Sequence, residues 1–469
     1  MFDLLIKNGQ AADPATGFFA EADVAVEGGR IALVEPGSAA AAHETIDAAG
    51  LIVQPGVIDT HLHVSTQPMG LRMAAMSGVT TCIDMMGPAS AVMNHICEAG
   101  AGINVAVLSA LVPNVNLPNS DPSAAQIDSA VTTALAEGAF GVKLLGGHFP
   151  LSPDATAEAV RTSAGRGVYL AWHAGTTTAG SDIEGMKQAV ELADGLPFHL
   201  AHINAYCRGR RRDVLEECLE AANLLKAHPE IVTESYLSDR SGAPLGLDEA
   251  GLPKSKVVSA QLKHFGFESS ADGITAAMAS GRLRAIVPND GVLGLLEPKD
   301  GVEAFRAGLV KEGVFTGVNP LVSRAFFACA RRSDGTFLVD ALSTDGGSLP
   351  RNVIVEGGCA LMKLGGLTPI EFAAKSSLIP ARMLGLHDKG SLRVGTDADI
   401  TIYDPVRGKA VFSFVGGRPV LQNGAVVACG GTVLTTKFGE EAVRSRGLNA
   451  HVLMIWTTHP MPSQSILAD

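Results

Sequence analysis

Segments typical of strands and of helices alternate along residues 53–387, and this pattern restricts the fold more than any other feature of the chain. The expected strands are short apolar runs such as GVIDTHLHV, GINVAVLSALV, AFGVKLL, GVYLAWH and PFHLAH, and Ala-rich segments of helical period lie between them. Such alternation is typical of a parallel α/β fold, either a closed barrel or a doubly wound sheet. With 46% hydrophobic residues among 469, the chain can bury a large core.

Both ends of the chain have a different residue pattern. Residues 1–52 and 388–440 consist of short β-branched runs punctuated by Gly-Gly and Pro, as expected for β structure. Because the termini of a domain often lie close together, we expect the two ends to form one small β domain. Residues 441–469 show no clear period and are expected to be a tail.

Charge and cysteine content exclude several classes of protein. The formal net charge is −12, which argues against a nucleic-acid partner. No uncharged apolar run is long enough for a membrane span, and the start of the chain does not resemble a signal peptide. The seven cysteines form no CxxC pair, which fits reduced thiols. These features favour a cytoplasmic protein.

The clearest chemical signal is the histidine pair in QPGVIDTHLHV. His61 and His63 end an apolar strand two residues apart, so that both rings point to the same side of the strand. Two imidazoles at the carboxyl end of a strand can chelate a metal, and barrel enzymes place their sites at that end. The alternative is a pair of histidines bonded to the backbone of the barrel rim.

Two further histidines follow later strands. His173 ends GVYLAWH, and PFHLAH contains both His199 and His202. Three positions apart on a strand, His199 and His202 face opposite sides, and we choose His202 for the site because it lies nearer the carboxyl end. Each could also be a histidine packed against a helix.

Lys143 lies within the apolar strand AFGVKLL, where a charged amine is costly. As a neutral amine it could add carbon dioxide and become a carbamate, which would bridge two metal ions. The alternative is a lysine that reaches out to the barrel rim. An aspartate is also expected to contribute, and periodicity leaves both Asp290 in LRAIVPNDG and Asp345 in FLVDALSTDGG open.

Motifs spread over nearly the whole chain resemble the amidohydrolase superfamily, and within it the hydantoinase, dihydroorotase and N-acyl amino acid deacylase branch. The matching segments, in order, are DLLIKNGQAADPATG, ADVAVEGGRIALV, QPGVIDTHLHV, SGVTTCIDM, GLTPIEFAAKSSLIPARMLGL and KGSLRVGTDADITIYDP. Their order is more specific than any single motif.

The resemblance implies a (β/α)8 TIM-like barrel over residues 53–387 with a β-sandwich built from residues 1–52 and 388–440. It also implies two divalent metal ions, usually zinc, held by His61, His63, carboxylated Lys143, His173, His202 and an aspartate. The family's last aspartate lies shortly before the closing helices, which favours Asp345, 21 residues before Gly366, over Asp290, 76 residues before it. Since the distance from His202 to Asp345 exceeds what two strand–helix units need, we expect an insertion around residues 205–335.

The implied reaction is hydrolysis of an amide C–N bond, in a cyclic amide or an N-acyl amino acid, by a hydroxide that bridges the metals. Asp345 is expected to act as general base and then as general acid. Candidate substrate-binding residues are His148, Tyr206 as an oxyanion donor and Arg208 as a carboxylate partner, although a solvated run of arginines at the start of a helix is the favoured explanation of Arg208. Cys82 lies too early on its strand to bridge metals, and Ser181 is expected to cap a helix.

Two other functions remain open from the sequence. A mononuclear aminohydrolase that deaminates a heterocycle would need no bridging lysine, so Lys143 argues against it. A non-catalytic scaffold of the same fold normally loses ligands, whereas all expected ligand positions are filled here. A homo-oligomer is expected.

Overall fold

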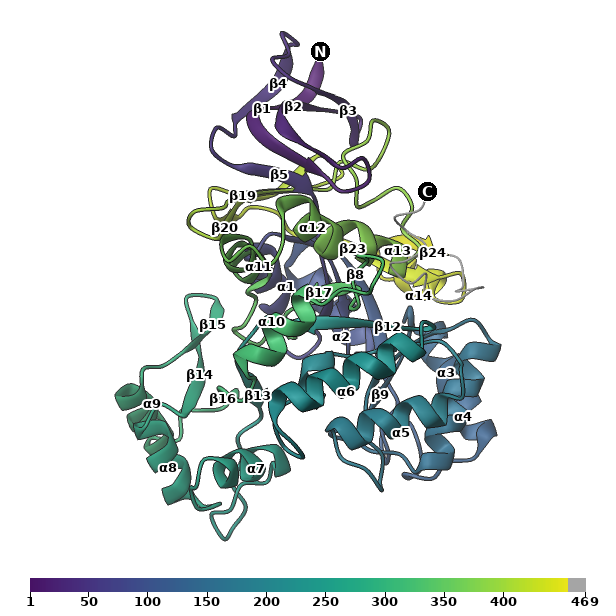
Figure 1. The fold of residues 1–469 in the computed structure, drawn as a ribbon, viewed down its shortest axis with the longest axis vertical. Coiled ribbons are helices and arrows are strands. Elements are labelled where there is room, and N and C mark those ends of the chain that lie inside the picture. Colours follow the sequence, from purple (N-terminus) through teal and green to yellow (C-terminus); the bar gives the residue numbers. More distant parts are fainter. Residues whose placement is uncertain (454–469) are drawn as a thin grey trace.

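The barrel is the largest part of the structure, a computed structural model that describes residues 1–453 (Figure 1). Its parallel strands are β6 (Val57–His63), β7 (Val79–Asp84), β8 (Gly100–Ala110), β9 (Gly141–Leu145), β10 (Tyr169–His173), β11 (Phe198–Leu200), β12 (Ile231–Tyr236), β17 (Ala341–Ser343) and β18 (Gly346–Gly347). β17 pairs with β12 and β18 pairs with β6, so together they form the last strand and close the barrel. The expected (β/α)8 fold is therefore confirmed.

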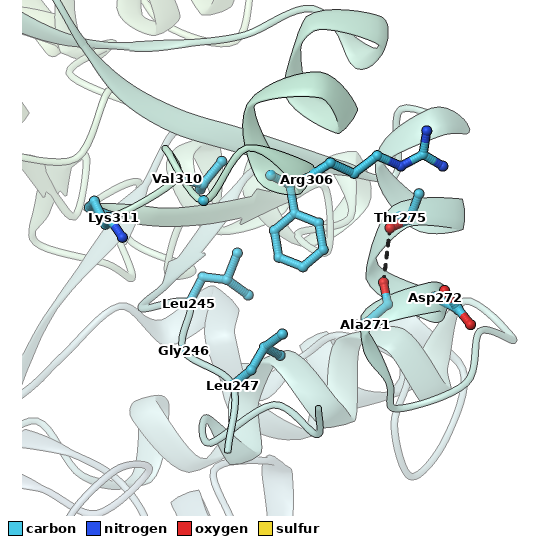
Figure 2. Close-up of a pocket in the computed structure, with 11 residues that line it drawn as sticks. Leu245, Gly246, Leu247, Ala271, Asp272, Thr275, Arg306, Val310 and Lys311 are labelled. Atoms are coloured by element: carbon cyan, nitrogen blue, oxygen red, sulfur yellow. Dashed lines mark hydrogen bonds between the residues drawn. The ribbon is translucent and has the colours of Figure 1, made fainter. Parts of the chain in front are cut away.

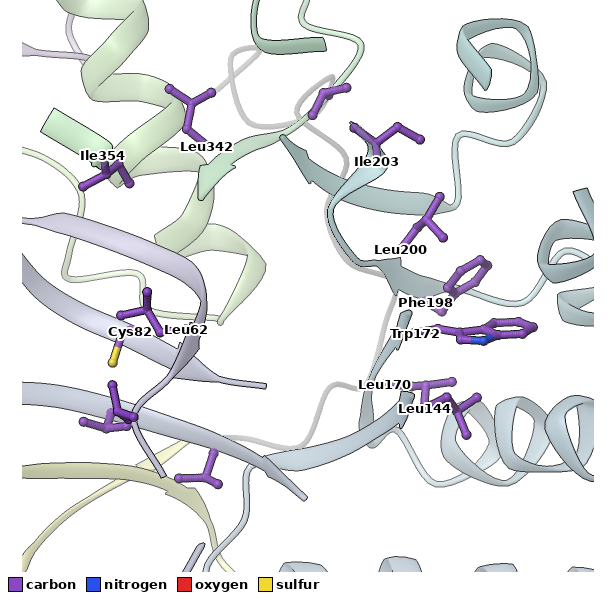
Figure 3. Packing of buried hydrophobic residues seen from close by; sticks show 14 of the residues in the cluster. Leu62, Cys82, Leu144, Leu170, Trp172, Phe198, Leu200, Ile203, Leu342 and Ile354 are labelled. Carbon is purple, nitrogen blue, oxygen red and sulfur yellow. The ribbon is translucent and has the colours of Figure 1, made fainter. Parts of the chain in front are cut away.

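Helices surround the strands and cover their outer faces (Figure 1). They include α1 (Gly70–Met76), α2 (Ala89–Glu98), α3 (Ala124–Ala136), α4 (Pro153–Gly165), α5 (Ile183–Ala193), α6 (Val214–Ala227), α10 (Leu321–Cys329) and α11 (Ile354–Lys363). The largest core cluster fills the layer between strands and helices, where the rings of Trp172 and Phe198 pack at 5.4 Å between centroids with their planes tilted by 53° (Figure 3). Cys82 is fully buried in this cluster, as expected for a core cysteine.

The two ends of the chain form a single nine-stranded sheet beside the barrel. Its N-terminal strands are β1 (Phe2–Asp13), β2 (Phe18–Glu27), β3 (Arg30–Glu35), β4 (Ala42–Asp47) and β5 (Ile52–Pro55), and its C-terminal strands are β19 (Ile400–Asp404), β20 (Lys409–Val415), β21 (Arg418–Gln422) and β22 (Ala425–Val426). The antiparallel pairing of β5 with β19 joins the two halves, and a separate apolar cluster lies against this sheet. A domain built from both termini was expected.

The segment expected to be a tail contains regular structure up to residue 453. β23 (Gly430–Thr436) pairs with β8, and β24 (Asn449–Leu453) pairs with β23, with α14 (Glu440–Arg444) between them. β8 is eleven residues long, and β9 pairs only with its second half, so β23 occupies the free edge of its first half. β23 was expected in the terminal β domain, and residues 454–469 of the expected tail lie outside the described residues.

The insertion forms a subdomain of its own between β12 and β17 (Figure 1). Its four-stranded sheet consists of β13 (Ser241–Ala243), β14 (Leu283–Asn289), β15 (Val292–Leu295) and β16 (Gly313–Thr316), and its helices are α7 (Lys256–His264), α8 (Ala271–Ala279) and α9 (Pro298–Arg306). It begins after Tyr236 rather than at residue 205, because α6 and β12 belong to the barrel. Leu245, Phe305 and Val310 line a cavity of about 520 Å³ within it (Figure 2).

Among residues 1–453, no helix is long and apolar enough to cross a bilayer.

Lys375, like Lys143, is a fully buried lysine, and it lies far from the histidines in the sequence. Its burial has a measurable effect on the stability of the fold. It lies in a π-helical turn (Ala374–Leu378) between α12 (Pro369–Ala373) and α13 (Ile379–Met383). Its Nζ donates to the Ala328 carbonyl at 2.8 Å and lies 4.4 Å from the centre of the Phe337 ring. Burial lowers the pKa of Lys375 to about 7.

We expect the free energy of unfolding to rise with pH between about 7 and 10.5 through this residue. In that window the unfolded chain holds the Lys375 proton and the folded chain does not, so raising the pH favours the folded state. Lys375→Met should therefore flatten the rise in the free energy of unfolding, measured by urea denaturation at several pH values. Equal slopes for wild type and variant would show that Lys375 stays protonated in the fold.

Candidate metal centre and active site

The expected site residues come from five different strands and converge at the carboxyl ends of the barrel. His61 and His63 end β6, Lys143 lies on β9, His173 ends β10, His202 follows β11, and Asp345 lies between β17 and β18. Lys143, His61 and His202 are buried, and the side chains of His63 and Asp345 are 17% and 14% exposed. The carboxyl ends of barrel strands meet at one rim, which explains why residues 284 positions apart (345 − 61) become neighbours.

Asp345 contacts both histidines of β6. Its Oδ1 lies 2.9 Å from His63 Nε2 and 3.6 Å from His61 Nε2. The backbone of Asp345 is left-handed, with φ 55°, and this turn directs the carboxylate toward β6. Asp290, the alternative, lies exposed at the hairpin between β14 and β15 in the insertion.

His202 and His173 meet on the opposite side of the site. His202 Nε2 lies 3.0 Å from His173 Nδ1, and the His202 ring stacks on that of His61 at 4.9 Å between centroids. His202 was expected to end the strand. It instead follows β11 in a left-handed turn with φ 37° that brings the ring into the site. His199 lies on β11 itself and contacts Glu234 instead.

Lys143 has an environment suited to a neutral amine. Its Nζ lies 3.3 Å from Met85 Sδ, and no carboxylate within residues 1–453 forms an ion pair with it. Burial lowers the pKa of Lys143 to about 8, although Glu234 and Asp345 act against this shift. A free amine is the form that adds carbon dioxide.

Arg351 holds the Asp345 carboxylate from the side away from the histidines. Its Nη2 lies 2.7 Å from Asp345 Oδ2, its Nε donates to the Asp345 carbonyl, and its Nη1 donates to the Arg240 carbonyl at 2.8 Å. Burial alone would raise the pKa of Asp345, but Arg351 and His61 hold this pKa well below its usual range. Asp345 is therefore ionised at neutral pH.

The donor atoms of the site fit divalent cations. Ligand atoms of His61, His202 and Asp345 all lie within 4.8 Å of one another. Burial lowers the pKa of His61 to about 4, so its ring is neutral, as a metal ligand must be. Within the part of the chain that the structure describes, the buried Nδ1 atoms of His63 and His202 have no hydrogen-bond partner. Imidazole and carboxylate donors in such a set are typical of zinc sites.

The expected role of Tyr206 is contradicted by its contacts. The Tyr206 hydroxyl accepts from the Ala174 N–H at 2.9 Å and donates to the Ala201 carbonyl at 2.8 Å, so its proton is not available to a substrate. Tyr206 instead joins the loops that carry His173 and His202. Ser181 is also not the cap of α5, because Asp182 accepts from the first N–H groups of that helix and Ser181 Oγ lies 2.8 Å from His173 Nε2.

Arg208 and His148 lie at the edge of the site. Arg208 Nη2 donates to the Tyr236 hydroxyl at 2.8 Å, and Arg208 Nε donates to Asn319 Oδ1 at 2.9 Å. Tyr236 lies 5.8 Å from His202 between ring centroids. The His148 ring lies on an exposed loop, 5.4 Å from the centroid of His173.

Glu234 and Arg351 were not among the expected site residues. Glu234 is fully buried in the middle of β12 and contacts His61. The signal that selects Lys143, a charged residue inside an apolar strand, also applies to Glu234 in the segment IVTESY. Arg351 follows Asp345 in a loop, where the sequence has no periodicity from which its contact could be inferred.

Comparisons with known proteins agree with this architecture. Residues 321–438 match the model of the amidohydrolase family. The chain is 26% identical over 442 residues to a dihydroorotase of Citrifermentans bemidjiense, with 86% of this chain and 90% of the relative covered. Two solved structures, one of a D-aminoacylase studied for its binuclear metal centre and one of an N-acyl-D-glutamate deacylase of Bordetella bronchiseptica with zinc and a phosphonate inhibitor, each cover 92% of this chain and 99% of their own, at 17% identity and a TM-score of 0.63.

The fold and the site define a (β/α)8 barrel with a histidine, lysine and carboxylate cluster at the carboxyl ends of its strands. The chain is similar to the amidohydrolase family in sequence over residues 321–438, and similar in fold to the two solved hydrolases over 92% of its length.

Proposed function

We propose that the protein is a metal-dependent hydrolase of amide C–N bonds in small molecules, either cyclic amides or N-acyl amino acids. The observation that carries this proposal is the convergence of His61, His202 and Asp345, with their ligand atoms within 4.8 Å, at the open end of the barrel. The dihydroorotase and deacylase relatives support the bond type.

The donor set suggests two divalent ions, with zinc favoured by the zinc-bound deacylase neighbour. His61 and His63 would hold one ion, His173 and His202 the other, and Lys143, as a carbamate, both, with Asp345 beside the β6 pair. When bound, such ions acidify a water and polarise a carbonyl.

The chain's own residues supply proton transfer and orientation. Asp345, ionised and held by Arg351, would accept a proton from the attacking water and deliver it to the leaving nitrogen. Arg208 Nη1 has no hydrogen-bond partner among the described residues and is directed by the bonds of Nε and Nη2, so it could bind a substrate carboxylate. His148 would lie beside the substrate. A homo-oligomer in the cytoplasm stays a prediction.

Metal analysis of the purified protein, followed by a substrate screen, tests the proposal. We expect about two divalent ions per chain and turnover of at least one member of a set of hydantoins, dihydropyrimidines, cyclic imides and N-acyl D- and L-amino acids. Removal of the metal with a chelator should abolish turnover, and added zinc should restore it. Full turnover in the metal-free protein would contradict the proposal.

A further inference from the structure

A chain of buried polar side chains runs behind the metal site, and Glu234 lies at its centre. Glu234 Oε1 lies 2.6 Å from His61 Nδ1 and accepts from the His202 N–H at 2.7 Å. Glu234 Oε2 contacts His199 Nε2, and His199 Nδ1 lies 2.8 Å from the Tyr169 hydroxyl. Glu234 and His199 are fully buried, so water does not compete for these bonds.

The chemistry of the partners determines where the protons lie. An ionised carboxylate only accepts hydrogen bonds, so both rings must donate to Glu234: His61 through Nδ1–H and His199 through Nε2–H. His199 then has a bare Nδ1, which accepts from the Tyr169 hydroxyl. With both imidazoles neutral, each hydrogen bond that links His61, Glu234, His199 and Tyr169 has one donor and one acceptor.

This arrangement leaves His61 with a bare Nε2. That atom lies 3.6 Å from Asp345 Oδ1, so two hydrogen-bond acceptors, the bare Nε2 and the carboxylate oxygen, lie side by side with no proton between them. Such a pair is repulsive unless a cation lies beside both. The tautomer set by Glu234 is therefore the one that His61 needs as a ligand.

We infer, on the basis of the metal site in the proposed function, that Glu234 is a positioning residue that sets the tautomer of His61 and the backbone turn of His202. One oxygen of Glu234 serves both, because the ring of His61 and the backbone of His202 bond to the same Oε1. In the proposed site the stacked rings of His61 and His202 would hold different ions, so a single carboxylate fixes the relative position of the two ligands.

Glu234→Gln removes the charge and keeps the shape. The amide oxygen can still accept from His61 and His202, but as a neutral acceptor it holds the Nδ1–H tautomer of His61 and the turn at His202 less strongly than the carboxylate does. The amide nitrogen faces His199, which changes tautomer and donates to Tyr169. Glu217→Gln is a matched control, because Glu217 is also fully buried and accepts from the backbone N–H groups of Gly209, Arg211 and Arg212. Glu217 contacts none of the candidate ligands through these bonds.

The experiment titrates the metal-free forms with zinc against a chromophoric chelator, and thermal unfolding of each metal-free form verifies its folding. Glu234→Gln is expected to lower zinc affinity roughly 10- to 100-fold, the usual effect of mutating the group that hydrogen-bonds a metal ligand, with Glu217→Gln unchanged. Glu234→Asp, whose carboxylate is one methylene shorter, should also bind zinc more weakly and provides a second test if the glutamine variant does not fold.

Zinc affinity of the Glu234 variants within twofold of wild type, or an equal loss in Glu217→Gln, would overturn this role. Zinc alone is the probe, so the outcome does not depend on knowing the substrate. A wild type that binds zinc and hydrolyses no amide would refute the proposed function and leave the role of Glu234 standing. A wild type that binds no zinc would refute both.

Discussion

Lys143→Ala is expected to lower the bound metal to one ion per chain or less and to remove most hydrolytic activity. In the proposed site the Lys143 carbamate is the only group that reaches both ions, so its loss weakens the centre as a whole. Burial of Lys143 lowers its pKa to about 8, which raises the fraction of the neutral amine that a carbamate requires above that of an ordinary lysine. Metal per chain and turnover on the substrate found by the screen are the measurements.

Short-chain carboxylates make this test specific for the carbamate. A small carboxylate that enters the space left by Lys143→Ala should restore part of the bound metal, because it replaces the bridging oxygens. Lys375→Ala is the matched control, since it also removes a fully buried lysine but lies in the turn after α12, and it should keep its metal. Normal metal content and turnover in Lys143→Ala would refute the carbamate.

The sequence predicts those parts of the molecule that follow from periodicity and from chain order. Alternation of strands and helices predicts a parallel α/β fold, which the family resemblance narrows to a barrel. The β-rich ends predict a domain of both termini, because these patterns reflect burial on each element. The histidine pair of β6 is equally local: residues 61 and 63 share a face of one strand, whatever surrounds it.

Features that depend on tertiary contacts could not be predicted in this way. His202 enters the site through a left-handed turn at φ 37°, and this conformation is stabilised by the bond from its N–H to Glu234, 32 residues later. The role expected for Tyr206 was wrong because its hydroxyl bonds to two backbone groups of neighbouring loops. β23 adds to β8 because β9 leaves half of that strand unpaired, a vacancy that exists only once the barrel has formed.

Asp345→Asn should reduce turnover by about 10²- to 10⁴-fold, the usual contribution of acid–base catalysis. The amide keeps the shape of the side chain but cannot accept a proton from water. The substitution leaves the other five candidate ligands in place, so most of the metal should remain bound. Turnover and metal stoichiometry are measured together.

Asp290→Asn is the matched control, and the backbone makes the match close. Both aspartates have left-handed backbones, with φ 55° at Asp345 and 48° at Asp290, a conformation that asparagine adopts as readily. Neither substitution therefore strains the chain, and a difference between them reflects the chemistry of the site. Asp290 lies exposed at the tip of the β14–β15 hairpin, so turnover should stay within a few-fold of wild type. An inactive Asp290→Asn beside a nearly normal Asp345→Asn would mean that the insertion, and not the last barrel strand, supplies the proton acceptor.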